Sequence, residues 1–240
     1  MKIIDLSCPF DLNYGVPYHV TKLESYEWKP CYTMKRDNHM ITKINFLTHS
    51  GSHIDAPCHV FEREDKKGIF TVDEWPLEQL YGETVVLDIP KGELEEITAD
   101  DLEKAKPEVK EGDIVLVHTG WGRYYVEDRK SPEYMTYRRP GFVPSAAEWL
   151  VKKKVKALGH DLIVTNHPNH QFLVSQEEKL KGLTTRHEPV HETLLGNDII
   201  LIEQLMNLDK VKGKRITAGF FALPLKGLDG SPIRALAFVD

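Results

Sequence analysis

The sequence predicts a single α/β domain. Its 240 residues are 41% hydrophobic, which is enough to bury a substantial core in one domain. Apolar segments of strand length alternate along the chain with segments of helical pattern, and no internal repeat or low-complexity linker separates them. We therefore expect about eight strands and about three or four helices in one unit.

Apolar runs of strand length give the first set of elements. The segment 41–48 alternates, so that Ile44 and Phe46 share one face, as in a half-buried strand. The segment 198–203 is apolar until Glu203, and a carboxylate in that place must be paired or lie at a rim. The predicted strands are 2–7, 41–48, 83–89, 114–119, 155–164, 198–203, 216–223 and 233–239.

Capping signals mark the helices. Thr98 followed by Asp101 is an N-terminal capping pattern, and Pro144 opens a second helix where its missing N–H costs nothing. A third helix, 184–195, ends at Gly196.

Two long loops separate these elements. The segments 9–30 and 131–144 are rich in aromatic residues, and loops of this kind often cover a binding site. For 9–30, an arm packed on the core or on a second subunit is an equally good interpretation.

Composition excludes several classes of function. A net charge of −6 and a pI of about 6.0 give no electrostatic footprint for nucleic acid. No apolar run is long enough to cross a membrane, and Asp5 lies where a signal peptide would be apolar. Cys8, Cys31 and Cys58 form no CxxC pair, which favours a reducing compartment. We expect a cytoplasmic protein.

The segment 49–59 carries the strongest chemical signal. It holds His49, His53, Asp55 and His59, and imidazoles with a carboxylate suit zinc, manganese or iron. A metal site on the first three of these residues would leave coordination positions open for an activated water or a carbonyl oxygen, as catalytic sites do. His59 is then a candidate proton carrier, with a fourth ligand as the alternative.

The same segment is not expected to be helical. Gly51 and Pro57 argue against a helix, so we expect a strand that ends near Thr48, followed by an irregular turn. The turn would aim the three predicted ligands at one point. A hydrogen-bonded histidine cluster without an ion is the alternative, and Cys58 is either a rival ligand or a small apolar residue.

Two later residues are candidates for a second ion. His191 lies on the predicted helix 184–195, and Glu203 ends the next strand. Because the turn between them reverses the chain, the two side chains can meet at one edge. If Asp55 bridges, they can hold a second ion with it, and a structural helix histidine is the alternative.

Residues 49–59 resemble the motif H-x-G-T-H-x-D-x-P-x-H, with Ser52 in place of threonine. This motif is typical of the cyclase-like metal-dependent hydrolases, which include bacterial kynurenine formamidase and isatin hydrolase. The segments 4–7 and 223–235 resemble the beginning and the end of that family.

The resemblance implies roles for individual residues. It makes His49, His53 and Asp55 ligands of a first ion and His59 the proton-transfer group. In the formamidase branch a later histidine and a glutamate, twelve residues apart, complete a second zinc site with the shared aspartate, and His191 and Glu203 have that spacing. The isatin hydrolase branch uses a single manganese, so one or two ions of zinc or manganese are expected.

The resemblance also implies a swivelling β/β/α fold with a mixed sheet, in one domain over residues 1–240. An N-terminal arm, 8–32, would shape the pocket of a neighbouring subunit in a homodimer or homotetramer. The arm lacks the family's Gly-Met-Pro pattern, and the segment 166–170 adds His167 and His170, to which we assign no role.

The function expected from these observations is hydrolysis of a C–N amide bond in a small aryl carbonyl compound by metal-activated water, as in an arylformamidase. Ring opening of a cyclic lactam, imide or lactone is the alternative activity. A metal-binding module without turnover, in which His59 closes the coordination shell, is an alternative of another class.

Overall fold

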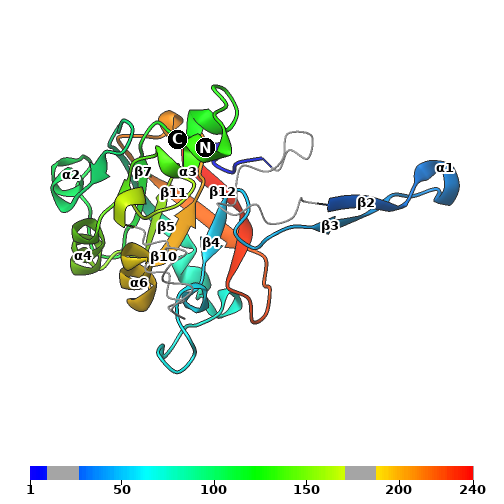
Figure 1. Ribbon diagram of the computed structural model, residues 1–240, viewed down its shortest axis with the longest axis horizontal. Coiled ribbons are helices and arrows are strands. Elements are labelled where there is room, and N and C mark those ends of the chain that lie inside the picture. The colour runs from blue at the N-terminus through cyan, green and yellow to red at the C-terminus, as the bar shows by residue number, and fades with distance from the viewer. Residues whose placement is uncertain (10–26, 171–187, 240) are drawn as a thin grey trace, which may run out of the picture.

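A closed barrel forms the centre of the molecule (Figure 1). The computed structural model describes residues 1–9, 27–170 and 188–239. Its eight-stranded sheet closes because β4 pairs with both β10 and β12, while β1 adds to β12 outside the ring. In sheet order the strands are β1 Lys2–Asp5, β12 Gly230–Val239, β11 Lys214–Ala222, β5 Tyr81–Asp88, β7 Ile114–His118, β9 Ala157–His160, β10 Ile200–Glu203 and β4 His53–Asp55.

The sheet is mixed, as predicted. Strands β5, β7, β9 and β10 run parallel to one another, and the other pairings are antiparallel. The parallel strands are apolar without alternation because both of their faces are covered. Within β7, for example, the four residues from Ile114 to Val117 are fully buried. The prediction of a strand over 155–164 was too long, since β9 ends at His160.

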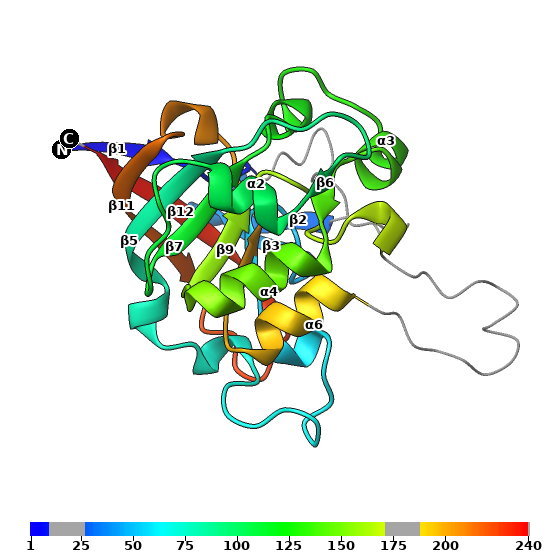
Figure 2. The same ribbon diagram turned by 90° about the vertical axis from the view of Figure 1, so that its left-hand side faces the viewer.

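Three helices cover the outer face of the parallel strands (Figure 2). They are α2 Ala99–Lys104, α4 Pro144–Lys153 and α6 Pro189–Gly196, and α4 packs against both α2 and α6. The predicted capping of α2 is confirmed, because Thr98 accepts from Asp101 N and the Asp101 side chain accepts from Thr98 N. Pro144 begins α4 as predicted. Residues 184–187 of the third predicted helix lie outside the described residues.

The loop predicted over 131–144 contains two regular elements. Helix α3, Pro132–Tyr137, is followed by β8, Gly141–Phe142, which pairs in parallel with β6, Glu96–Ile97. Aromatic content concealed the helix, although Ser131 caps it and Pro132 begins it. Short 3-10 turns complete the described elements: η1 Pro57–His59, η2 Val72–Glu74, η3 Leu77–Gln79, η4 Gly122–Tyr125, η5 Pro168–His170 and η6 Leu208–Lys210.

A two-stranded arm projects from the barrel (Figure 1). It consists of β2 Glu27–Tyr32, α1 Met34–Asp37 and β3 Ile41–Asn45. The prediction of a half-buried strand at 41–48 was therefore wrong in its burial, since every residue of β3 is exposed, including Ile44 at 55%. Alternation indicates a strand with one apolar face, but it cannot show that the chain supplies a layer to cover that face. The predicted arm, 8–32, contains only the first of its two strands.

One hydrophobic core runs through the described residues, from Ile4 in β1 to Ala237 in β12. This core matches the predicted single-domain α/β fold. None of the described helices has both the length and the apolarity needed to cross a membrane.

Candidate metal centre

The predicted ligands His53 and Asp55 lie on β4, a strand of three residues. Side chains two apart on a strand point to the same face, so both reach the site while Ile54 between them is fully buried in the core. Strand β4 places His53 opposite Glu203 of β10. The expectation that one irregular turn carries all three ligands was therefore wrong. The turn carries His49 and ends before His53, whereas His53 and Asp55 are positioned by the pairing of β4 with β10 and β12.

The preceding turn places His49. Gly51 has a φ of 62°, which favours glycine, and its carbonyl oxygen accepts a hydrogen bond from His53 Nδ1 at 2.8 Å. That bond leaves the lone pair of His53 on Nε2, which faces Asp55 Oδ1 at 3.4 Å. His49 Nδ1 lies 2.7 Å from the same oxygen. The structure thus brings His49, His53 and Asp55 together, with ligand atoms within 4.8 Å of one another.

A second triad shares Asp55. His191 is buried on α6, and its Nε2 lies 3.5 Å from Asp55 Oδ2 and 3.5 Å from Glu203 Oε1. The other oxygen of Glu203 lies 3.5 Å from His53 Nε2. The two carboxylates therefore lie between two groups of imidazoles. We name His49, His53 and Asp55 the early triad, and Asp55, His191 and Glu203 the late triad.

The donor set fits divalent cations. Asp55 is fully buried, yet among the described residues its Oδ2 accepts no hydrogen bond. A buried carboxylate oxygen that accepts no hydrogen bond is costly unless a positive charge, here the nearby His191 or a metal cation, satisfies it. Nitrogen and oxygen ligands in these numbers are those that zinc and manganese accept. The residues present therefore fit one ion or two.

The electrostatics of the metal-free protein support the same interpretation. Burial opposes a charge on His49, but the Asp55 and Asp229 carboxylates raise its pKa to about 10. Burial also opposes a charge on Glu203, yet its contact with His191 lowers the pKa to about 2. The pKa of His191 is raised well above its usual value because Glu188, Asp55 and Glu203 outweigh its burial. Protonated imidazoles thus balance ionised carboxylates where an ion would otherwise do so.

His59 lies beside both triads and belongs to neither. It ends η1, with its ring centroid 4.0 Å from that of His49 and 5.9 Å from that of His191. Its side chain is 20% exposed, whereas the five predicted metal ligands are more deeply buried. This placement gives it access both to the site and to solvent.

Several residues of the site were missed in the sequence. Asp229 faces His49 and His59, Asn166 Oδ1 accepts from His191 Nδ1 at 2.9 Å, and Thr165 donates to Glu203 Oε1 through its N–H at 2.7 Å and its hydroxyl at 2.6 Å. Glu188, the N-cap residue of α6 and three residues before His191, is also buried beside it. The signal for Asn166 and Asp229 was present, because both lie in segments that the sequence already singled out.

Two of the remaining unassigned residues, His167 and Cys58, have structural roles. His167 Nε2 donates to Leu94 O at 3.0 Å, and its Nδ1 accepts from Asn169 N, so this histidine holds the loop. The side chain of His170 lies outside the described part of the chain. Cys58 is half-buried and packs against the core, which agrees with a small apolar role.

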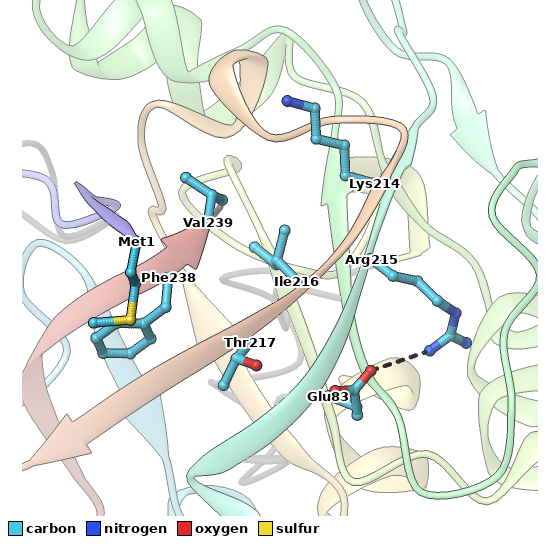
Figure 3. Close-up of a pocket in the computed structure, with 8 residues that line it drawn as sticks. All are labelled: Met1, Glu83, Lys214, Arg215, Ile216, Thr217, Phe238 and Val239. Atoms are coloured by element: carbon cyan, nitrogen blue, oxygen red, sulfur yellow. Dashed lines mark ion pairs between the residues drawn. The ribbon is translucent and has the colours of Figure 1, made fainter.

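A separate hollow of about 590 Å³ lies at the other end of β12 (Figure 3). Its lining includes the apolar side chains of Ile216, Phe238 and Val239 and an ion pair between Glu83 and Arg215. Because β12 extends from Gly230, beside Asp55, to Val239, this hollow is roughly 30 Å from the two triads. None of its lining residues belongs to either triad.

The comparisons with known proteins agree with this geometry. A sequence model of the family described as Putative cyclase matches residues 4–167. The chain is 28% identical to isatin hydrolase from Roseibium aggregatum over 80% of this chain and 72% of that protein. It is also 28% identical to kynurenine formamidase from Geobacillus thermodenitrificans, over 81% and 78% of the two chains. A solved structure of a potential metal-dependent hydrolase with cyclase activity superposes with a TM-score of 0.71 at 25% identity, covering 98% of this chain and 96% of that one.

Proposed function

This chain belongs to the family described as Putative cyclase, and from that premise we propose that it is a metal-dependent hydrolase of a small aryl carbonyl compound. The bond cleaved is the C–N bond of an amide, and a formamide on an aromatic ring is the first candidate. Similarity to kynurenine formamidase and to isatin hydrolase supports the reaction class.

One observation carries the proposal. The two carboxylate oxygens of Asp55 face two different triads, Oδ1 toward His49 and His53 and Oδ2 toward His191. A bridging carboxylate between two sets of ligands is the arrangement of a two-metal hydrolase. We propose zinc or manganese, with one ion on the early triad and one on the late triad.

The ions would supply a Lewis acid for the carbonyl oxygen and would lower the pKa of water toward about 7. The residues of the chain have their own tasks. Asp55 and Glu203 provide the negative charge that holds the cations in a buried site. His53 is held in the correct tautomer by the Gly51 carbonyl oxygen.

His59 is the proposed proton-transfer residue. It takes a proton from the attacking water and returns it to the leaving nitrogen, a role that requires an imidazole near the site but not bound to an ion. Its position against the rings of His49 and His191 supports this role. His59 also has ligand atoms near those of His49 and Asp229, and of Glu188 and His191, so a fourth-ligand role is the alternative.

Ring opening of a cyclic amide is the second candidate, because the identity to isatin hydrolase equals that to kynurenine formamidase. Both reactions add water to a carbonyl carbon and break a C–N bond. They differ in whether the leaving nitrogen remains attached to the product, which the metal ligands do not determine.

An activity screen tests the function. Tag-free protein, loaded separately with zinc and manganese, is assayed against N-formyl aryl amines, cyclic imides and lactones, with His59→Ala as the control. We expect turnover of a formyl aryl amine by the parent and loss of most of it in the variant. Tight metal binding without turnover of any of these compounds would favour a binding module instead.

The arm supports a proposal about assembly. An isolated two-stranded ribbon is marginally stable in water, and Trp28, Ile41 and Ile44 of this arm are each about half exposed. We propose that a second copy of the chain covers the arm in a homodimer or homotetramer. Light scattering on the parent and on Ile44→Lys tests this, and a monomeric parent would contradict it.

The cytoplasmic location stays a prediction. The three cysteines form no disulfide in the described structure, and they lie apart, with Cys8 buried and Cys31 exposed on the arm. This is compatible with a reducing compartment.

A further inference from the structure

Asp229 lies beside the early triad although it is far from it in sequence. It directly precedes β12, and its carbonyl oxygen accepts a hydrogen bond from Ala56 N at 2.8 Å, next to Asp55. The neighbouring Gly230 packs on the ring of His49 so closely that a Cβ there would lie 2.8 Å from His49 Cε1. The backbone thus brings Asp229 against the imidazole edge that faces away from Asp55.

The carboxylate of Asp229 touches three side chains. Its Oδ1 accepts from Thr48 Oγ1 at 2.9 Å, which fixes the orientation of the group. Its Oδ2 lies 3.0 Å from His49 Nε2 and 3.8 Å from His59 Nδ1. One oxygen therefore faces a candidate metal ligand and the candidate proton-transfer residue together.

For His49 this contact selects a tautomer. The ring has two nitrogens, and Nδ1 faces Asp55 and the early triad at 2.7 Å. A metal ligand needs its lone pair on that nitrogen, so the proton must be on Nε2, where Asp229 accepts it. Carboxylates in this position orient ligating histidines and typically change metal affinity by about 10- to 100-fold.

For His59 the same oxygen lies within ion-pair distance, 3.8 Å from Nδ1, which favours the ring orientation in which Nδ1 faces the carboxylate. With Nδ1 directed to Asp229, the other nitrogen, Nε2, is left to exchange the proton of the reaction. The rings of His49 and His59 lie 4.0 Å apart with 34° between their planes, so movement of one is limited by the other. A carboxylate behind a proton-carrying imidazole limits the orientations that the ring can adopt.

We propose that Asp229 is a positioning residue that acts on His49 and His59 at once: it fixes the tautomer of the metal ligand and the orientation of the proton-transfer residue. This inference rests on the proposed function for its second half only. Its first half concerns metal binding and stands without any substrate.

The alternative is that Asp229 is itself a ligand, because His49, His59 and Asp229 also bring ligand atoms within 4.8 Å of one another. The contacts favour positioning. His49 offers Nδ1 to the early triad and Nε2 to Asp229, and an ion on the second side would have to share this ring with the first. The number of ions lost in a variant separates the two roles.

The experiment compares Asp229→Asn and Asp229→Glu with Asp209→Asn, an exposed acid that gives the same charge change away from the site. Zinc is titrated into metal-stripped protein by calorimetry, with the melting temperature as the test of folding. For Asp229→Asn we expect unchanged stoichiometry and zinc affinity lower by about 10- to 100-fold at the early triad. For Asp229→Glu we expect a zinc affinity close to that of the parent, and for Asp209→Asn we expect no change in zinc affinity.

A second readout follows the proton-transfer role. On any substrate that the parent hydrolyses, Asp229→Asn should lower kcat by at least about 10² while KM changes by less than about threefold. The absorption spectrum of the cobalt-loaded variant should shift, since the orientation of His49 changes.

Parental zinc affinity in Asp229→Asn would overturn the inference, and so would the loss of one whole ion, which would make Asp229 a ligand. If the parent hydrolyses none of the tested compounds, the proposed function fails while the zinc titration still decides the tautomer role.

Discussion

The early and late triads are built in different ways. The early one comes from seven consecutive residues, 49–55, in which a glycine turn and a short strand place His49 and Asp55. The late one combines His191 of α6 with Glu203 of β10, and it exists because β10 pairs with β4 in the closed barrel. A ligand set within one loop and strand is therefore visible in the sequence, whereas a set assembled by closure depends on the whole fold.

Asp55 joins the two triads, so its loss should have the largest effect. In Asp55→Asn we expect both ions to be lost and activity to fall by at least about 10³-fold, since metal activation contributes several kcal/mol. Metal content of tag-free protein and kcat/KM give the result. The matched control is Asp113→Asn, a buried carboxylate paired with Arg215 outside the site, which should keep both ions. Retention of one ion in Asp55→Asn would show that the triads are independent.

A substitution at His59 should lower the turnover rate without changing metal binding. His59→Ala is expected to keep the parental metal content and to lose about 10²- to 10⁴-fold in kcat, because only proton transfer is removed. His118→Ala, which removes a histidine paired with Asp88, is the control and should change neither quantity. Loss of an ion from His59→Ala would instead make His59 a ligand.

The late triad alone is addressed by His191→Ala. We expect one ion of two to be lost, with the early ion kept, and turnover to fall by about 10²-fold. Metal analysis after dialysis against limiting zinc measures this. Unchanged metal content would reject the dinuclear arrangement and leave His191 as a structural residue.

Both triads predict proton release on metal binding. The pKa of His49 is raised to about 10 and that of His191 well above its usual value, so both rings are protonated in metal-free protein at pH 7.5. Zinc should then displace about two protons, which calorimetry in buffers of different ionisation enthalpy detects. Zinc binding without proton release would contradict the protonation of both rings.

The raised pKa of His49 also affects the stability of the metal-free protein. The raised pKa of His49 stabilises the metal-free fold fully below pH 6.5, and this contribution is lost as the pH rises to about 10. The depressed pKa of Glu203 acts in the opposite direction, and its contribution is lost as the pH falls from 4.5 to about 2. The melting temperatures of metal-free parent and His49→Gln should therefore converge between pH 6.5 and 10. A constant difference over that range would contradict the raised pKa.

The smallest expected effect concerns the support of the late triad. Thr165→Val removes the hydroxyl that donates to Glu203 Oε1 at 2.6 Å, and we expect about tenfold weaker binding of the late ion with the early ion unchanged. Thr84→Val is the matched control, because Thr84 is equally buried and its hydroxyl donates to Gly82 O, a backbone group outside the two triads. Equal effects of the two substitutions would indicate a general loss of stability.

The sequence predicted the barrel strands better than the arm. Segments such as 114–119 are apolar because they are covered on both faces, and this property shows in composition alone. The alternation at 41–48 showed a strand, but whether another layer covers Ile44 depends on how the chain is assembled. Local sequence patterns thus predicted where strands form. Whether a strand is buried depended on how the strands are arranged in the folded chain.

The site followed the same rule. His49, His53, Asp55 and His59 are close in sequence and were singled out by density and residue type. Asp229 and Thr165 lie far from them in the sequence. Asp229 falls in a segment that the sequence singled out, but only the closed barrel shows that it faces His49 and that Thr165 donates to Glu203. A bridging role for Asp55 was predicted only as a condition, because the sequence could not place His191 and Glu203 beside that residue as the fold does.

A crystal structure of tag-free protein, with anomalous diffraction recorded at the zinc and manganese edges, would locate the ions themselves. We expect two anomalous peaks on opposite sides of the Asp55 carboxylate, one within bonding distance of His49 and His53 and the other within bonding distance of His191 and Glu203. A loaded protein with no peak in contact with Asp55 would contradict this arrangement.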